Sequence, residues 1–324
     1  MASSSYAIKT TGLTKEYGHL KAVNNLSIEI NESEIFGLLG PNGAGKTTTV
    51  RLLTGMLKPT LGDGQVIGYD IRKDSDIIRE NVGILTETSS LYERLSVRDN
   101  LNFFAKMYDI PKSEIKGRIE DIVNLFELSD KIDEQAGTLS KGMRQKVAIA
   151  RAILHDPNLL FLDEPTSALA PESARTVRDF IQTLSRQKHR TIFLNTHNLS
   201  EAEELCSRVG IIEKGILIAL GSPNELRSIL HDDIITVFRF KQWSNEIQDY
   251  FGSLNGNIIN LDIKEKSLSI KLEKAEDQTP EIVKELVGKN LSIIEVKHVK
   301  PSLERIYLEL VNGENKMKNM EEIK

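Results

Sequence analysis

Residues 40–48 read GPNGAGKTT, and this stretch constrains the fold more than any other part of the chain. It has the form G-x-x-x-x-G-K-[ST], it follows the short apolar run Ile35–Leu39, and it precedes a helical pattern over Thr49–Leu53. Glycines let the backbone curl so that successive N–H groups point at phosphate oxygens, and a helix N-terminus adds partial positive charge. We therefore predict a strand, a phosphate loop and a helix that together bind a nucleotide.

Two side chains of this loop carry specific expectations. Lys46 is expected to supply a movable cation for the β- and γ-phosphates, and the Thr47 hydroxyl is placed to ligate Mg²⁺. The residues expected to contact the nucleotide through this loop are Gly40, Pro41, Asn42, Gly43, Ala44, Gly45, Lys46, Thr47 and Thr48.

Length and composition limit the remaining possibilities. A chain of 324 residues is expected to form two domains, and its formal net charge of −5 argues against sequence-independent binding of nucleic acid. The single cysteine, Cys206, is compatible with a reducing cytoplasm. We see no signal peptide and no apolar stretch approaching 18 residues. If the protein works at a membrane, we expect a partner to span it.

Two apolar runs end in polar residues that suit a catalytic site. The run beginning at Asn158 ends in Asp163 and Glu164, and carboxylates at the C-terminal edge of a parallel sheet lie where ligands bind. The run Thr191–Asn195 delivers His197 to the same edge. The alternatives are a solvated acidic turn and, for the histidine taken alone, an ordinary structural residue.

Other segments have a clear pattern without a clear function. Two strands are expected within residues 6–30, over Ala7–Thr10 and Val23–Ile30, around a turn in which Tyr17 could be an ordinary aromatic residue. A helical insertion is expected over about 96–155, and a hairpin over Arg208–Leu220. Ser140 is a natural N-cap for a helix inside that insertion.

The C-terminal segment, residues 232–324, is expected to fold separately. Its patterns give the order β-α-β-β-α-β, which is the ferredoxin-like order, with a final helix over Ser302–Leu310. Thr279 is expected to cap the second helix, with Pro280 at its first position. The alternative is a loose accessory tail. Because no catalytic constellation occurs in this segment, we expect it to serve regulation or dimer contact.

Four separated stretches resemble one family over roughly residues 6–225, the ATP-binding subunits of ABC transporters. GPNGAGKTT resembles the Walker A loop, LLFLDEPT the Walker B motif and LSKGMRQK the signature motif, while His197 resembles the switch histidine. By the same resemblance Tyr17 stacks on adenine and Glu87 falls in the Q-loop. LSKGM and the ending PSLERIYLEL are similar to the subgroup of drug-resistance and sodium-efflux exporters.

The resemblance implies an α/β fold of the ABC-type P-loop NTPase class, with a parallel core sheet, an antiparallel β subdomain and the helical insertion. We expect this ATPase domain over 1–230 and the ferredoxin-like domain over 231–324. The implied function is ATP binding and hydrolysis that powers a separate integral-membrane permease, at the inner face of the cell membrane. An ATPase that acts on DNA or ribosomes is the alternative, and a P-loop kinase or GTPase is a third possibility. The transported substrate is not encoded in these motifs.

The implied mechanism uses two copies of the chain and ATP with Mg²⁺. Each ATP would lie between one phosphate loop and the partner's signature residues. Thr47, Glu87 and Asp163 would hold Mg²⁺, Glu164 would polarise the attacking water, and His197 would contact the γ-phosphate. Lys46, Glu164 and His197 are thus the expected catalytic residues. The signature residues are Ser140, Lys141, Gly142 and Met143.

The sequence departs from the family pattern at three places. Lys141 and Met143 replace a glycine and a glutamine of the usual LSGGQ, and Glu87 replaces the Q-loop glutamine. Ala170 stands where the D-loop usually has aspartate. Because that carboxylate is missing, we expect the two ATP sites to hydrolyse more independently than in relatives that have it.

Overall fold

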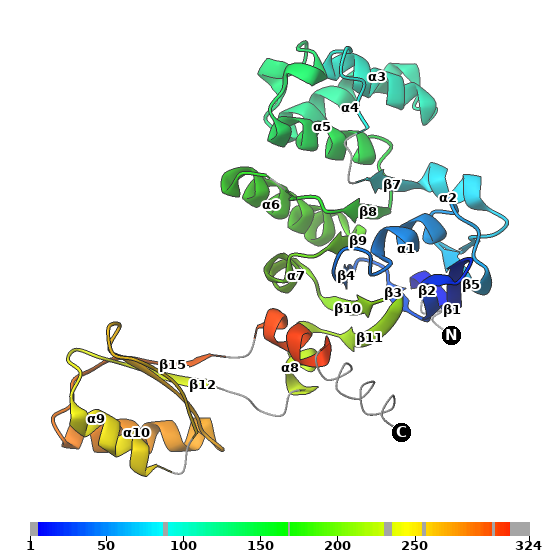
Figure 1. The fold of residues 1–324 in the computed structure, drawn as a ribbon. Coiled ribbons are helices and arrows are strands. Elements are labelled where there is room, and N and C mark those ends of the chain that lie inside the picture. The colour runs from blue at the N-terminus through cyan, green and yellow to red at the C-terminus, as the bar shows by residue number, and fades with distance from the viewer. Residues whose placement is uncertain are drawn as a thin grey trace. The chain divides into compact units, whose positions relative to one another are not determined.

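The computed structural model describes residues 6–86, 90–167, 169–229, 235–254, 257–299 and 302–311. The chain forms two compact units, Met1–Pro223 and Asn224–Lys324, each with its own sheets and helices (Figure 1). None of the helices in the described ranges combines the length and the apolar character needed to cross a bilayer.

A six-stranded sheet forms the centre of the first unit, in the order β11-β10-β4-β9-β8-β7. All neighbouring strands are parallel except β11, which is antiparallel to β10. The strands β4, β8 and β9 are buried along their whole length, which explains their continuous apolar sequences. The bounds are β4 (Ile35–Leu39), β7 (Val82–Leu85), β8 (Leu159–Asp163), β9 (Thr191–Thr196), β10 (Arg208–Glu213) and β11 (Ile216–Gly221).

Three phenylalanines in one row fix the register of the three central strands. Phe193 of β9 pairs with Phe36 of β4 and with Phe161 of β8, with ring centroids 5.6 and 5.5 Å apart. The same register pairs Leu39 with Thr196. The carboxyl ends of these strands, and the loops that follow them, therefore lie at one edge of the sheet.

The first unit also contains an antiparallel sheet, in the order β2-β1-β5-β6, with β3 paired to β1. The expected single strand from Val23 to Ile30 is wrong, because β2 ends at Leu26 and β3 begins only at Glu29, with Ser27 and Ile28 outside both strands. The Thr10 hydroxyl bridges the interruption by donating to the Leu26 carbonyl. The bounds are β1 (Tyr6–Tyr17), β2 (Leu20–Leu26), β3 (Glu29–Asn31), β5 (Leu61–Val66) and β6 (Tyr69–Asp70).

The helices of the first unit include the predicted helical insertion, formed by α3, α4 and α5 between β7 and β8 (Figure 1). Ser96 caps α3 by accepting the Asp99 N–H at 3.0 Å. Two short 3₁₀ turns, Ser129–Lys131 and Ala136–Thr138, lie between α4 and α5. The bounds are α1 (Lys46–Leu53), α2 (Ser75–Asn81), α3 (Val97–Met107), α4 (Lys112–Leu125), α5 (Lys141–Ile153), α6 (Pro171–Lys188) and α7 (Leu199–Leu205). The next helix, α8 (Pro223–Ile229), begins at the last residue of the first unit and continues into the second.

The single cysteine of the sequence packs against a strand of the central sheet. Cys206 follows α7 and is buried, and a β-carbon added to Gly37 of β4 would lie 2.8 Å from its sulfur. Burial raises the pKa of the Cys206 thiol. Glycine at position 37 therefore lets the thiol contact the strand backbone directly.

The second unit contains a four-stranded antiparallel sheet in the order β13-β14-β12-β15, with α9 and α10 against one face (Figure 1). Its core gathers Phe238, Phe240 and Phe251 with Leu268 and Ile270. The predicted β-α-β-β-α-β order is confirmed, and residues 303–311 are helical as expected. The bounds are β12 (Ile235–Phe240), α9 (Asn245–Ser253), β13 (Asn257–Asp262), β14 (Ser267–Lys271), α10 (Ala275–Gly288) and β15 (Ile293–Val299).

The predicted start of α10 at Thr279 and Pro280 is wrong. The helix begins five residues earlier, where Lys274 accepts the Gln278 N–H through its carbonyl and donates its own N–H to the Gln278 side chain at 3.0 Å. Pro280 therefore lies inside the first turns of the helix. A reciprocal cap formed by residues that are not usual capping residues outweighs the local preference of proline for the first position.

Candidate nucleotide-binding site

The phosphate loop joins β4 to α1 and is enclosed by backbone from two other elements. Gly45 has a φ of 107°, and a β-carbon there would lie 2.3 Å from the Ala22 carbonyl oxygen. A β-carbon at Gly40 would lie 2.2 Å from the Ile212 carbonyl oxygen. Only glycine fits at these two positions, so the loop passes directly against β2 and β10.

Lys46 is the first residue of α1 and folds back over the loop. Its Nζ donates to the carbonyl oxygens of Gly40 at 2.7 Å and Pro41 at 3.1 Å, and the residue is only 7% exposed. The ammonium group is thereby held against the loop at the cavity. This is an arrangement suited to phosphate oxygens.

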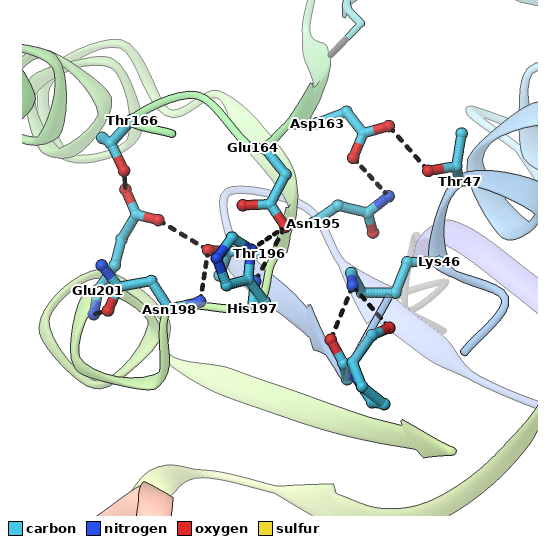
Figure 2. Close-up of polar contacts among 12 residues, drawn as sticks. Lys46, Thr47, Asp163, Glu164, Thr166, Asn195, Thr196, His197, Asn198 and Glu201 are labelled. Atoms are coloured by element: carbon cyan, nitrogen blue, oxygen red, sulfur yellow. Dashed lines mark hydrogen bonds and ion pairs between the residues drawn. The ribbon is translucent and has the colours of Figure 1, made fainter. Parts of the chain in front are cut away.

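Thr47 and Asp163 meet across the end of the central sheet, as Figure 2 shows. The Thr47 hydroxyl donates to Asp163 Oδ2 at 3.1 Å, and the Asn195 amide approaches Asp163 Oδ1 at 3.4 Å. Asn195 is buried, and within the described part of the chain its Oδ1 has no hydrogen-bond partner. The hydroxyl, the carboxylate and the spare amide oxygen are hard oxygen donors, so these residues fit Mg²⁺.

Glu164 and His197 form the second polar contact of the site (Figure 2). Glu164 Oε1 accepts the His197 backbone N–H at 3.0 Å and lies 2.7 Å from His197 Nδ1. The Glu164 side chain is 13% exposed, whereas the His197 side chain is 56% exposed. A carboxylate that accepts from Nδ1 favours the tautomer of His197 in which Nδ1 carries the proton. The other ring nitrogen, Nε2, is then available to a ligand.

A single cavity of about 650 Å³ collects most of the predicted residues. Its lining includes Tyr17, a residue that is 48% exposed, and two basic residues that the sequence analysis missed, Lys21 and Lys214. Both missed lysines lie at or beside hairpin turns, a location that carries no motif of its own. The predicted site residues that line the cavity are Tyr17, Pro41, Asn42, Gly43, Gly45, Lys46, Thr47, Thr48, Asp163, Glu164 and His197.

Gly40 and Ala44 contribute to the loop through their backbone. Gly40 accepts from Lys46, as described above, and the Ala44 carbonyl accepts the Gly215 N–H at 2.9 Å. Glu87, the predicted Q-loop ligand, lies outside the described residues.

The signature residues begin α5 and are not among the residues that line this cavity. Ser140 caps the helix by accepting the Met143 N–H at 3.2 Å, and a β-carbon at Gly142 would meet Ser173 of α6. Gln145 of the same helix donates to the Pro165 carbonyl at 2.9 Å. The signature helix is thus tied to the turn that carries Glu164.

A buried carboxylate that the sequence analysis did not identify lies behind the site. Glu201 of α7 accepts from the hydroxyls of Thr166 and Thr196. Burial raises its pKa, and the two hydroxyls oppose that effect. In sequence it is one of several acidic residues in a short helix, so nothing local distinguished it.

A glycine-rich loop between a buried parallel strand and a helix, with carboxylates at the end of a nearby strand, defines a P-loop nucleotide hydrolase. Comparison with known sequences makes this specific. Residues 23–167 match the family described as "ABC transporter", and residues 221–311 match "ATP-binding protein DrrA1-3-like, C-terminal domain". The chain belongs to the ABC transporter ATP-binding proteins, a family of ATPases.

Individual relatives agree with this assignment. The chain is 34% identical over 310 residues to the uncharacterized ABC transporter ATP-binding protein YhcH of Bacillus subtilis (strain 168), covering 95% of this chain and 97% of the relative. The chain is 42% identical over 211 residues to the bacitracin transport ATP-binding protein BcrA of Bacillus licheniformis, covering 65% of this chain and 68% of the relative. The chain is 37% identical over 223 residues to the Nod factor export ATP-binding protein I of Rhizobium sp. (strain N33), covering 69% of this chain and 73% of the relative.

Comparison of structures supports the same fold. A solved structure described as an ATP binding subunit of an ABC transporter aligns with a TM-score of 0.64 and 28% identity, over 69% of this chain and 93% of that one. The predicted P-loop NTPase fold class is confirmed. The relatives also favour the transporter interpretation over an ATPase that acts on DNA or ribosomes.

Proposed function

We propose that this chain hydrolyses ATP to power a separate transmembrane permease, and that the transport is export. Residues 1–230 would act as the ATPase domain and residues 231–324 as an accessory domain without chemistry of its own. The relatives in bacitracin transport and Nod factor export support this direction, as does the match of the C-terminal segment to a DrrA-like domain.

The observation that carries the proposal is the convergence of three polar contacts on one cavity. Lys46 is held over the phosphate loop, Thr47 contacts Asp163, and Glu164 contacts His197. Lys46 would neutralise the β- and γ-phosphates. Glu164 would accept the proton of the attacking water, and His197 would present its outer nitrogen to the γ-phosphate.

Mg²⁺ would be held by Thr47 and Asp163, with Glu87 as the predicted third ligand. When bound, the ion would neutralise charge that develops on the phosphate oxygens. The chain's own contribution here is to position two oxygen donors from different elements within 3.1 Å of each other.

The proposed working state is a dimer that closes on ATP. The signature helix would donate from its N-terminus to a γ-phosphate bound by the partner's loop, because its first N–H groups have no partner inside the helix. Lys141, the first residue of α5, would add a cation there. Tyr17, half-exposed at the cavity rim, would stack on the adenine.

The permease would hold the dimer at the inner face of the membrane. Purification of a tagged chain from membrane extracts tests this partner. Recovery of a multispanning protein supports the proposal, whereas recovery of ribosomes or nucleic acid in its place contradicts it.

Substitution Lys46→Ala tests the hydrolytic site. The loop would lose the cation that faces the phosphates, so we expect ATP turnover to fall at least about 100-fold. Release of phosphate from ATP measures this directly. Lys116→Ala, on a side chain that is 84% exposed on α4, is the matched control and should retain full activity. Turnover at the wild-type rate in Lys46→Ala would show that the site is wrongly assigned.

A further inference from the structure

Glu201 joins two segments of the chain that carry the reacting groups. It lies in the first turn of α7 and is 2% exposed. Its Oε1 accepts from Thr166 Oγ1 at 2.7 Å and its Oε2 accepts from Thr196 Oγ1 at 2.9 Å, as drawn in Figure 2. Each carboxylate oxygen therefore holds a different segment.

The two threonines are close in sequence to the reacting residues. Thr166 comes two residues after Glu164, and Thr196 directly precedes His197. The same two segments also meet directly, through the contact of Glu164 Oε1 with His197 Nδ1 at 2.7 Å. Side-chain connections thus span the turn after β8 and the end of β9 on both sides, at the cavity through Glu164 and behind it through Glu201, in addition to the backbone hydrogen bond from Glu164 to Asn195.

Further hydrogen bonds close the buried connection and fix the direction of the Thr196 hydroxyl. Thr196 Oγ1 accepts the Asn198 N–H at 3.0 Å, so its own proton is directed to Glu201. The Asn198 side chain accepts the Glu201 N–H at 3.1 Å. Thr196, Asn198 and Glu201 therefore form a ring of hydrogen bonds that has a single consistent arrangement of donors and acceptors.

As an ionised carboxylate, Glu201 would bind both hydroxyls tightly. A buried carboxylate is stable only when its oxygens accept hydrogen bonds, and bonds to an ionised acceptor are shorter and stronger than neutral ones. Movement of either threonine away from Glu201 would leave a buried charge unsatisfied. The two segments are consequently held at one separation.

We propose that Glu201 is a positioning residue for hydrolysis, which holds the His197 segment against the turn of Glu164 through Thr196 and Thr166. This inference rests on the proposed ATPase site. Glu201 touches neither the nucleotide loop nor the cavity, so its loss would misalign the reacting pair and leave the residues that bind ATP in place.

Two threonine variants test this with little change in shape. Thr166→Val and Thr196→Val each remove one hydroxyl, whereas Thr166→Ser and Thr196→Ser keep it. We expect kcat to fall roughly tenfold in each valine variant while KM for ATP stays within about twofold. Both serine variants should recover most of the wild-type kcat.

Glu201→Gln provides an independent comparison, because it keeps the size of the side chain and replaces one acceptor oxygen by a donor. Its kcat should fall by at least as much as in the valine variants, and adding Thr196→Val to it should cause little further loss. Thermal melting of every variant shows whether it folds. If Glu201→Gln does not fold, the valine and serine pairs decide the outcome alone.

Three results would overturn the inference. They are valine variants that keep the wild-type kcat, serine variants that lose as much kcat as the valine variants, and a rise in KM with unchanged kcat. Failure of the underlying ATPase site is recognised separately, by full turnover in Lys46→Ala. Loss of turnover in Lys46→Ala together with wild-type kcat in the valine variants would contradict the role of Glu201 only.

Discussion

At the scale of single residues, Glu164 combines a strained backbone with a side chain that is held by hydrogen bonds. Its φ of 50° is left-handed, a conformation that costs a residue with a β-carbon about 1–3 kcal/mol. The cost is offset locally, because its N–H donates to the Asn195 carbonyl at 2.9 Å and its carboxylate accepts from His197. The turn that follows β8 thereby directs the carboxylate into the cavity.

Glu164→Gln separates binding from hydrolysis. Glutamine can keep the hydrogen bond to the His197 N–H but cannot accept a proton from water, so we expect turnover to fall at least about 100-fold with ATP binding intact. ATP should then hold two copies together as a long-lived dimer. Size-exclusion chromatography with and without ATP measures this, and a variant that stays monomeric with ATP would contradict the dimer or the role of Glu164.

The residues found from the sequence share one property, which is a fixed spacing within a motif. Lys46, Thr47, Asp163 and Glu164 were located in this way, and the structure places all four around one cavity. Their roles stay predictions. Glu201 was missed because its significance depends on Thr166 and Thr196, which reach it only when β8 and β9 lie side by side.

At the scale of elements, the phosphate loop is held by two neighbouring hairpins as well as by β4 and α1. Gly215, in the turn between β10 and β11, donates to the Ala44 carbonyl and accepts the Asn24 N–H at 2.8 Å. Gly45 lies against the Ala22 carbonyl. The loop is therefore a point of attachment between the central sheet and the antiparallel sheet.

Gly45→Ala tests this attachment. The added methyl group would meet a carbonyl oxygen at 2.3 Å, so we expect a loss of at least about 2 kcal/mol in the free energy of unfolding. Gly68→Ala is the matched control, since Gly68 has a φ of 83° with no atom within 4 Å of the added carbon. The Gly68→Ala variant should lose only about 1 kcal/mol in the free energy of unfolding. Equal losses in denaturant titrations would mean that the contact with Ala22 contributes nothing.

Ends of elements were harder to predict than the elements themselves. The parallel strands and the β-α-β-β-α-β order follow from apolar patterns that persist over many residues. The start of α10 depends instead on the reciprocal hydrogen bonds between Lys274 and Gln278. The break between β2 and β3 is bridged by the Thr10 hydroxyl, which donates to the Leu26 carbonyl and accepts the Ile28 N–H. Local sequence preferences do not predict which side chain will make such a hydrogen bond.

At the scale of the whole molecule, the chain consists of two units with separate cores. The first core contains Phe36, Phe161 and Phe193, and the second contains Phe238 and Phe251. Because each unit buries its own apolar residues, each has the means to fold alone. The nucleotide cavity is lined entirely by residues of the first unit.

Truncation after Ser228 tests this independence. We expect the fragment to fold and to bind ATP with unchanged affinity, while dimerisation weakens or the hydrolysis rate changes. Circular dichroism establishes folding, and titration with a fluorescent ATP analogue measures affinity. Complete loss of nucleotide binding in a folded fragment would show that the domain boundary is misplaced.

The burial of Cys206 against Gly37 gives the protein a built-in chemical probe. The sequence contains a single thiol, so alkylation needs no engineered label and reports on this position alone. Its rate under native conditions measures how often β4, the strand that leads into the phosphate loop, separates from Cys206 at the end of α7. Slower labelling in the presence of nucleotide would measure directly how much binding rigidifies this part of the central sheet.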